Sequence, residues 1–176
     1  MQIYLAGGCF WGVQAYFDLL RGVESTRVGY ANAQERALSN LSYEVVCSGL
    51  SGAVEAVEIT FDEEVLPLEE VLARFFSIID PVSVDRQGND IGSQYRSGIY
   101  ARDLHILDVA SEFITRRVIP KVAPKVALHT SKQIATEVLP LRNFTPAESY
   151  HQKYLANNPN GYCHIDISKA LEPIES

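Results

Sequence analysis

The chain has 176 residues, of which 47% are hydrophobic and 21% are charged, with 11 Gly and 8 Pro. At this length folding buries roughly 70% of the unfolded surface, so length and composition exclude a disordered, collagenous or low-complexity chain and predict a single globular domain over residues 1–176. Fifteen Lys plus Arg against 22 Asp plus Glu leave a formal charge of −7 without a basic cluster, so nucleic acid is not an expected partner.

The sequence carries no sign of export or of membrane insertion. Its apolar runs are far shorter than the ~20 residues of a membrane span, and Met1 leads into folded-looking sequence without a basic leader. Three cysteines are an odd number, which favours a working thiol or redox pair over a disulfide framework. We therefore expect a cytoplasmic protein with no membrane contact.

The first hundred residues alternate between strand-like and helix-like patterns. The expected order is a strand at 2–6, a helix at 10–20, a strand at 23–30, a polar loop at 31–42, a strand at 53–61, a helix at 68–79 and a strand at 97–101. This β-α-β-β-α-β order predicts an α+β fold, a two-layer α/β sandwich with a mixed sheet and a split βαβ (ferredoxin-like) core.

The second part of the chain gives weaker patterns. We expect a helix at 103–118, extended segments at 126–130 and 134–139, a short helix at 146–156 opened by Thr145, and a loop-rich tail from about 157.

Cys9 stands at the predicted boundary between the first strand and the first helix, in the run GGCFWG at 7–12. Free backbone N–H groups and the helix dipole favour an anion there, which predicts a depressed pKa and a nucleophilic thiolate. An inert buried thiol is the alternative. Phe10 and Trp11 could wall an apolar pocket for a methyl or thioether group; Phe10 fits the helix core equally well, whereas Trp11 lies off the apolar stripe.

Glu55 falls on the apolar face of the strand at 53–61, because the period of two groups it with Ala53, Val57, Ile59 and Phe61. Burial of a carboxyl group raises its pKa, so Glu55 is a candidate general acid. The alternative is an exposed residue at the start of the strand with no function.

Hydroxyl and carboxyl groups that could accompany Glu55 occur in two polar stretches. Tyr43 follows the loop at 31–42, and Asp90 and Tyr95 lie in a glycine-punctuated segment before the strand at 97–101. Such groups can donate or orient hydrogen bonds at a site, although most of the nine tyrosines are expected to be ordinary core or surface residues.

Cys163 lies in the tail, more than 150 residues after Cys9. A tail cysteine can act as a resolving thiol if its Cα comes within about 7 Å of that of an oxidised Cys9. A spectator thiol is the alternative, and Cys47 resembles a small apolar filler.

Metal binding and proteolysis compete with this interpretation. The sequence has no Cys-x-x-Cys or His-x-x-x-His pair, which argues against a metal site. A cysteine protease with His151 or His164 as base is possible, but only the helix start resembles an oxyanion hole.

Four separated motifs resemble the A-type peptide methionine sulfoxide reductases. They are GCFWG at 8–12, GND at 88–90, QYRS at 94–97 and NGYC at 160–163, with weaker support from ESYHQKYL at 148–155. The resemblance runs from Ile3 to about Ile167 and extends to the reductase domain of fusions with a B-type partner.

The resemblance implies that Cys9 attacks the sulfoxide sulfur while Phe10 and Trp11 hold the S-methyl group. It implies three hydrogen-bond donors to the sulfoxide oxygen, namely Glu55, Tyr43 and Tyr95. The family acts on the S epimer at sulfur, in free methionine sulfoxide, peptides and oxidised proteins, and needs no metal or organic cofactor.

For the second half of the reaction, the resemblance implies a Cys9 sulfenic acid that condenses with Cys163, and a disulfide that thioredoxin reduces. Asp90 would organise the site through hydrogen bonds. Because nothing after Cys163 is a cysteine, we expect a two-cysteine cycle in a monomer, with Cys47 outside it.

The chain departs from the family pattern in front of two proposed donors. The usual Gly-His-Ala-Glu reads GAVE at 52–55, and the usual Asn-Pro-Ser/Thr-Tyr reads NLSY at 40–43. A noncatalytic module that binds methionine sulfoxide and a thiol peroxidase are the remaining alternatives; no basic residue stands beside Cys9 in sequence, which argues against the peroxidase.

Overall fold

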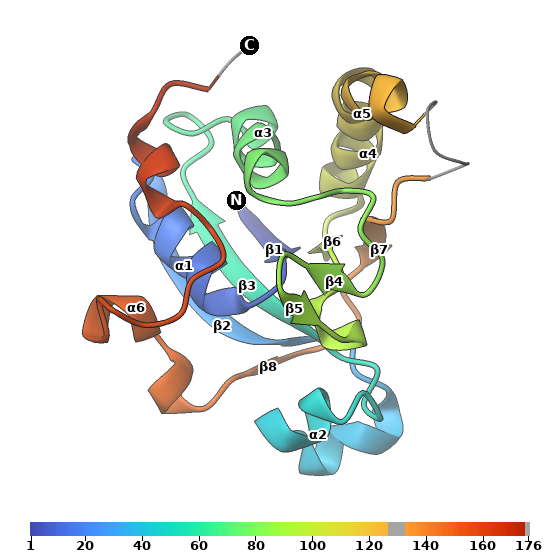
Figure 1. Ribbon diagram of the computed structural model, residues 1–176, viewed down its shortest axis with the longest axis vertical. Helices are drawn as coiled ribbons and strands as arrows, with labels where there is room; N and C mark the ends of the chain where they lie inside the picture. The colour runs from blue at the N-terminus through green and yellow to red at the C-terminus, as the bar shows by residue number, and fades with distance from the viewer. Residues whose placement is uncertain (127–132, 175–176) are drawn as a thin grey trace.

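The fold is built around one mixed sheet, seen in a computed structural model that describes residues 1–126 and 133–174 (Figure 1). The strands are β1 (Gln2–Ala6), β2 (Val23–Ala31), β3 (Val54–Phe61), β4 (Arg86–Gln87), β5 (Asp90–Ile91), β6 (Gly98–Ala101), β7 (Glu137–Pro140) and β8 (Phe144–Pro146). The helices are α1 (Phe10–Asp18), α2 (Tyr43–Cys47), α3 (Leu68–Ile78), α4 (Leu104–Phe113), α5 (Ile119–Val126) and α6 (Tyr154–Asn157).

The sheet has the order β7-β6-β1-β3-β2-β8, and β4 pairs with β5 in a separate small hairpin. All neighbours are antiparallel except β6 and β7, which are parallel. The inner order β6-β1-β3-β2 is that of the split βαβ arrangement, since β1 and β2 run in the same direction on either side of β3. The predicted α+β fold with a mixed sheet is therefore confirmed.

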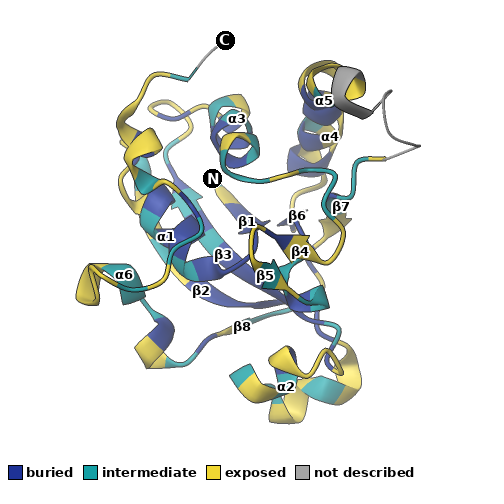
Figure 2. Cartoon of the chain, in the orientation of Figure 1, coloured by how far each residue is buried: buried dark blue, intermediate teal, exposed yellow. Residues whose placement is uncertain are grey.

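The main core lies between the sheet and the helices α1, α3 and α4. Figure 2 shows buried residues along the strands and on the helix faces that turn toward them. The largest fully buried side chains on this side include Phe10, Phe17, Phe61, Phe75 and Leu72. A smaller apolar cluster covers the opposite face of the sheet, where Tyr4 packs against Phe144 at 5.0 Å between ring centroids.

The structure differs from the predicted elements in the second half of the chain. The helix expected at 103–118 continues through a five-residue π-helical segment, Ile114–Val118, into α5. Of the segment 126–130 predicted to be extended, Val126 ends α5 and the rest lies outside the described residues. The other extended segment is confirmed only in part, as β7.

The prediction of a helix at 146–156 is wrong. Pro146 ends β8, which pairs with β2, and only a 3-10 turn at Ser149–His151 and the short α6 follow. Lys153 takes a left-handed conformation with φ of 54°, which interrupts any continuous helix.

The helices of the described chain are all too short or too polar to span a bilayer.

Candidate active site

The sheet register brings the predicted site residues to one edge. Ala6 pairs with Gly98, and Leu5 pairs with Val57. Because β1 is antiparallel to both β3 and β6, the end of β1 lies beside the start of each of them. This edge of the sheet therefore brings together Cys9, which follows β1, Glu55, which lies at the start of β3, and Tyr95, which precedes β6.

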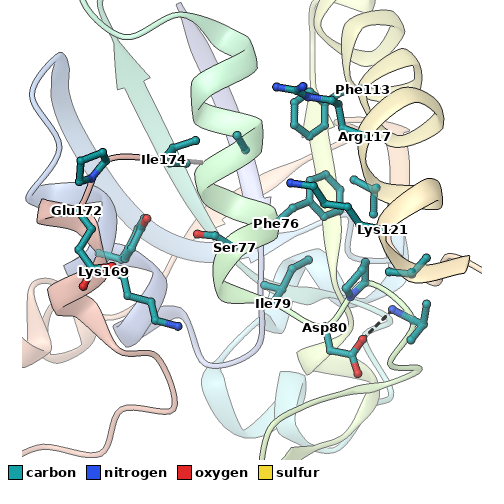
Figure 3. A pocket seen from close by; sticks show the side chains of 17 residues that line it. Phe76, Ser77, Ile79, Asp80, Phe113, Arg117, Lys121, Lys169, Glu172 and Ile174 are labelled. Atoms are coloured by element: carbon teal, nitrogen blue, oxygen red, sulfur yellow. Dashed lines mark hydrogen bonds between the residues drawn. The ribbon is translucent and has the colours of Figure 1, made fainter. Parts of the chain in front are cut away.

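A separate hollow of about 770 Å³ lies between α3, α5 and residues 169–174 (Figure 3). Its wall includes the stacked rings of Phe76 and Phe113, whose centroids are 5.9 Å apart. None of the predicted site residues is among the described residues that line it.

Cys9 is the residue immediately before α1 and is only 8% exposed. The chain reaches it through Gly8, which has φ of +86° and no room for a side chain, since a Cβ there would lie 2.7 Å from the Cβ of Gln87. Glycine is required for this turn because other residues rarely adopt that conformation. The predicted strand, glycine turn and helix start are confirmed.

The pKa of Cys9 is raised, not depressed as the sequence predicted. Burial is the largest cause, followed by the negative charge of Glu55, while a hydrogen bond from the backbone N–H of Trp11 acts in the opposite direction. The helix start is therefore outweighed mainly by the loss of water around the buried sulfur. The resting site holds a thiol.

Glu55 is 2% exposed and lies on the core side of β3, as its strand period predicted. Its Oε2 accepts a hydrogen bond from the backbone N–H of Phe10 at 3.1 Å. Burial raises the pKa of Glu55 to about 8, with the charge of Asp90 as a smaller cause in the same direction. The predicted raised pKa is confirmed, and the carboxyl is mainly protonated at neutral pH.

Tyr43 and Tyr95 lie beside this carboxyl group. Tyr43 opens α2, while Tyr95 ends a 3-10 turn at Ser93–Tyr95. The pKa of Tyr95 is raised by burial and then by the charge of Glu55, and burial also raises the pKa of Tyr43. Both phenols therefore remain protonated donors.

Asp90 approaches from the β4–β5 hairpin. Its Oδ2 lies 3.3 Å from Nδ1 of His164, and its carboxylate contributes, after burial, to the raised pKa of Tyr162. The charge of Asp90 raises the pKa of both Cys9 and Glu55. The structure thus places Asp90 within electrostatic reach of both groups.

An aromatic cluster flanks the first turn of α1. Trp11 stacks on Tyr154 with ring centroids 3.8 Å apart, and its Nε1 donates to Nδ1 of His151 at 3.2 Å. Phe10 is buried, with its ring 5.2 Å from that of His151. His151 is 2% exposed, and burial lowers its pKa, so it is a neutral acceptor for Trp11. This role differs from the protease base considered from the sequence.

Glu148 is a contributor that sequence reasoning did not single out. Its carboxylate accepts hydrogen bonds from the hydroxyl of Tyr30 at 2.6 Å and from the backbone N–H of Tyr43 at 3.0 Å. It therefore fixes the start of α2 against β2. The only sequence signal was its place in the run at 148–155.

The described cysteines are all free thiols. Cys163 lies against α1, since a Cβ on Gly12 would be 3.0 Å from its Sγ. That Sγ donates to the carbonyl of Ile165 at 3.1 Å. Cys47 is exposed at the end of α2, so the prediction of an apolar filler is wrong; the helix turns it toward solvent.

No group of three His, Cys, Asp or Glu side chains with metal-binding geometry occurs within 1–126 and 133–174.

Comparisons with known proteins agree on one family. The model of the family "Peptide methionine sulfoxide reductase" matches residues 1–176. A curated relative from Malacoplasma penetrans, "Peptide methionine sulfoxide reductase MsrA", is 47% identical over 94% of this chain and 96% of its own. A relative of the same description from Clostridium botulinum is 48% identical over 94% of this chain and 98% of its own.

Solved structures show the same likeness. Methionine sulfoxide reductase A of Corynebacterium diphtheriae is 35% identical with a TM-score of 0.83, covering 92% of this chain and 76% of its own. Reduced Mxr1 from Saccharomyces cerevisiae is 35% identical with a TM-score of 0.81, covering 93% of this chain and 88% of its own.

Proposed function

Because the chain belongs to the peptide methionine sulfoxide reductase family, we propose that Cys9 reduces the S epimer of methionine sulfoxide and that Cys163 and a thioredoxin regenerate it. The observation that carries the proposal is the meeting of a buried thiol, Cys9, with a carboxyl group that is protonated at neutral pH, Glu55. A nucleophile and an acid at one position are what oxygen removal from a sulfoxide needs.

In the first step the sulfur of Cys9 attacks the sulfoxide sulfur, and negative charge develops on the sulfoxide oxygen. Glu55 gives this oxygen its proton, and the hydroxyls of Tyr43 and Tyr95 donate hydrogen bonds to it. The thiol of Cys9 loses its own proton as it attacks, and this proton returns Glu55 to its protonated, neutral form. Oxygen passes to Cys9 as a sulfenic acid, and methionine leaves with its sulfur reduced.

Phe10 and Trp11 would hold the S-methyl group against Cys9. The hydrogen bond from Trp11 to His151 and its stacking on Tyr154 fix the indole before substrate arrives. A pocket wall that is already ordered lowers the entropy lost on binding. Because only a methyl group needs to enter, free methionine sulfoxide, peptides and oxidised proteins could all be substrates.

In the second step the thiol of Cys163 displaces the oxygen of the sulfenic acid as water and forms a disulfide with Cys9. The position of Cys163 against Gly12 in the first turns of α1 supports this step. Mxr1, the yeast relative, has been solved in complex with Trx2, which supports thioredoxin as the reductant. The cycle fits a monomer in a reducing compartment such as the cytoplasm, where a catalytic disulfide is returned to thiols.

Replacing Cys163 by serine should separate the two steps. The Cys163→Ser variant is expected to release about one methionine per enzyme molecule, because Cys9 can still accept the oxygen, but to turn over at least about tenfold more slowly with thioredoxin. The measurement is methionine formed with and without thioredoxin. Sustained turnover of the Cys163→Ser variant at the wild-type rate with thioredoxin would show that Cys163 takes no part in the mechanism.

A further inference from the structure

A histidine and an aspartate face each other beside the proposed redox pair in a way that leaves two buried atoms unsatisfied. Nδ1 of His164 and Oδ2 of Asp90 lie 3.3 Å apart. Each is buried and makes no well-aligned hydrogen bond within the described residues. The two side chains are 7% and 14% exposed, so water provides little compensation.

The other ring nitrogen fixes where the protons are. Nε2 of His164 lies 3.0 Å from the backbone carbonyl oxygen of Gly7. A carbonyl only accepts, so Nε2 must carry a hydrogen. In a neutral imidazole Nδ1 would then be a lone pair facing the lone pairs of a carboxylate. Burying two acceptors against each other is unfavourable, so the contact attracts the two side chains only when Nδ1 also carries a hydrogen.

This pair joins three segments at the site. His164 follows Cys163 directly in sequence, and Asp90 lies on β5. The imidazole also touches the turn before Cys9, because a Cβ on Gly8 would lie 3.0 Å from Nε2. The contact therefore ties the segment of the second cysteine to the turn that carries the first.

We propose that His164, held between the carbonyl of Gly7 and the carboxylate of Asp90, seats the Cys163 segment on the Cys9 turn for disulfide formation. The inference rests on the disulfide proposed above and names His164 as a positioning residue for that step. It assigns His164 no part in the attack on the sulfoxide.

The reaction in question is balanced without a further reactant. The sulfur of Cys163 bonds to the sulfur of Cys9, the S–O bond of the sulfenic acid breaks, and the thiol proton of Cys163 leaves with the oxygen as water. The contact of His164 with Asp90 and Gly7 takes no part in this exchange and holds the two sulfurs in reach.

The test follows methionine release and thiol loss together, after one addition of N-acetyl methionine S-sulfoxide without reductant. For His164→Gln, whose amide can still donate to Gly7 but no longer reaches Asp90 as the imidazole does, we expect one methionine at the wild-type rate. Disulfide formation should be about tenfold slower. Dimedone should trap a longer-lived sulfenic acid. His105→Gln, at an exposed histidine on α4, is the matched control.

A second variant keeps the test independent of the folding of the first. In Asp90→Asn the amide can donate to Nδ1 of His164 and keeps the contact, so disulfide formation, timed from methionine release, should stay within about twofold of the wild type, whereas Asp90→Ala should slow it about tenfold. Wild-type rates of disulfide formation in both His164→Gln and Asp90→Ala would overturn the inference while leaving the disulfide intact. A wild-type enzyme that releases methionine without losing two thiols would overturn the disulfide and the inference together.

Discussion

Replacing Cys9 by serine is expected to lower methionine formation by at least about a thousandfold, because it removes the nucleophile. A serine hydroxyl is a far weaker nucleophile toward sulfur and cannot carry the oxygen as a sulfenic acid. The measurement is release of methionine from N-acetyl methionine S-sulfoxide with dithiothreitol in excess.

Cys47→Ser is the matched control for this experiment. Cys47 is the exposed cysteine at the end of α2, and it lies outside the proposed cycle. This variant should keep activity within about twofold of the wild type, since exposed substitutions of similar size change little. Equal losses in both variants would mean that Cys9 is not the nucleophile.

Replacing Glu55 by glutamine should lower the rate of methionine release by about a hundredfold near pH 7, within the usual range for a general acid. The amide keeps the shape and one donor but has no proton to transfer. Because the pKa of Glu55 is raised to about 8, the wild-type carboxyl is protonated below that pH and loses its proton above it. The ratio of the wild-type rate to the Glu55→Gln rate should therefore be largest below pH 8 and decrease above it.

Ionisation of the Cys9 thiol has the opposite effect on the rate of methionine release, since more of the reactive thiolate forms as the pH rises. The expected contrast is a wild-type rate that levels off or falls above about pH 8 and a Glu55→Gln rate that continues to rise. Single-turnover rates between pH 6 and 10 measure both. Parallel profiles would show that Glu55 does not supply the proton.

The first hundred residues reveal their fold because each element carries its own pattern. The period of two in β3 and the helical spacing in α1 and α3 belong to local sequence, so these elements begin and end close to where the patterns do. In contrast, β8 has three residues and exists because it pairs with β2, more than a hundred residues earlier. No local pattern announces such a strand.

The site residues also divide into those whose properties follow from local sequence and those whose properties depend on distant elements. The raised pKa of Glu55 could be predicted because the strand period alone places it among apolar side chains. The raised pKa of Cys9 could not, because its burial and the charges of Glu55 and Asp90 come from other elements. His151 was noted only as a possible base, since its partner Trp11 is 140 residues away.

The most direct test of the central claim is turnover of N-acetyl methionine S-sulfoxide by the wild-type chain with dithiothreitol, beside the R epimer and the Cys9→Ser variant. We expect the S epimer alone to be consumed, with one methionine formed for each dithiothreitol oxidised, and no reaction in the variant. Failure to reduce either epimer, or reduction that persists without Cys9, would contradict the account.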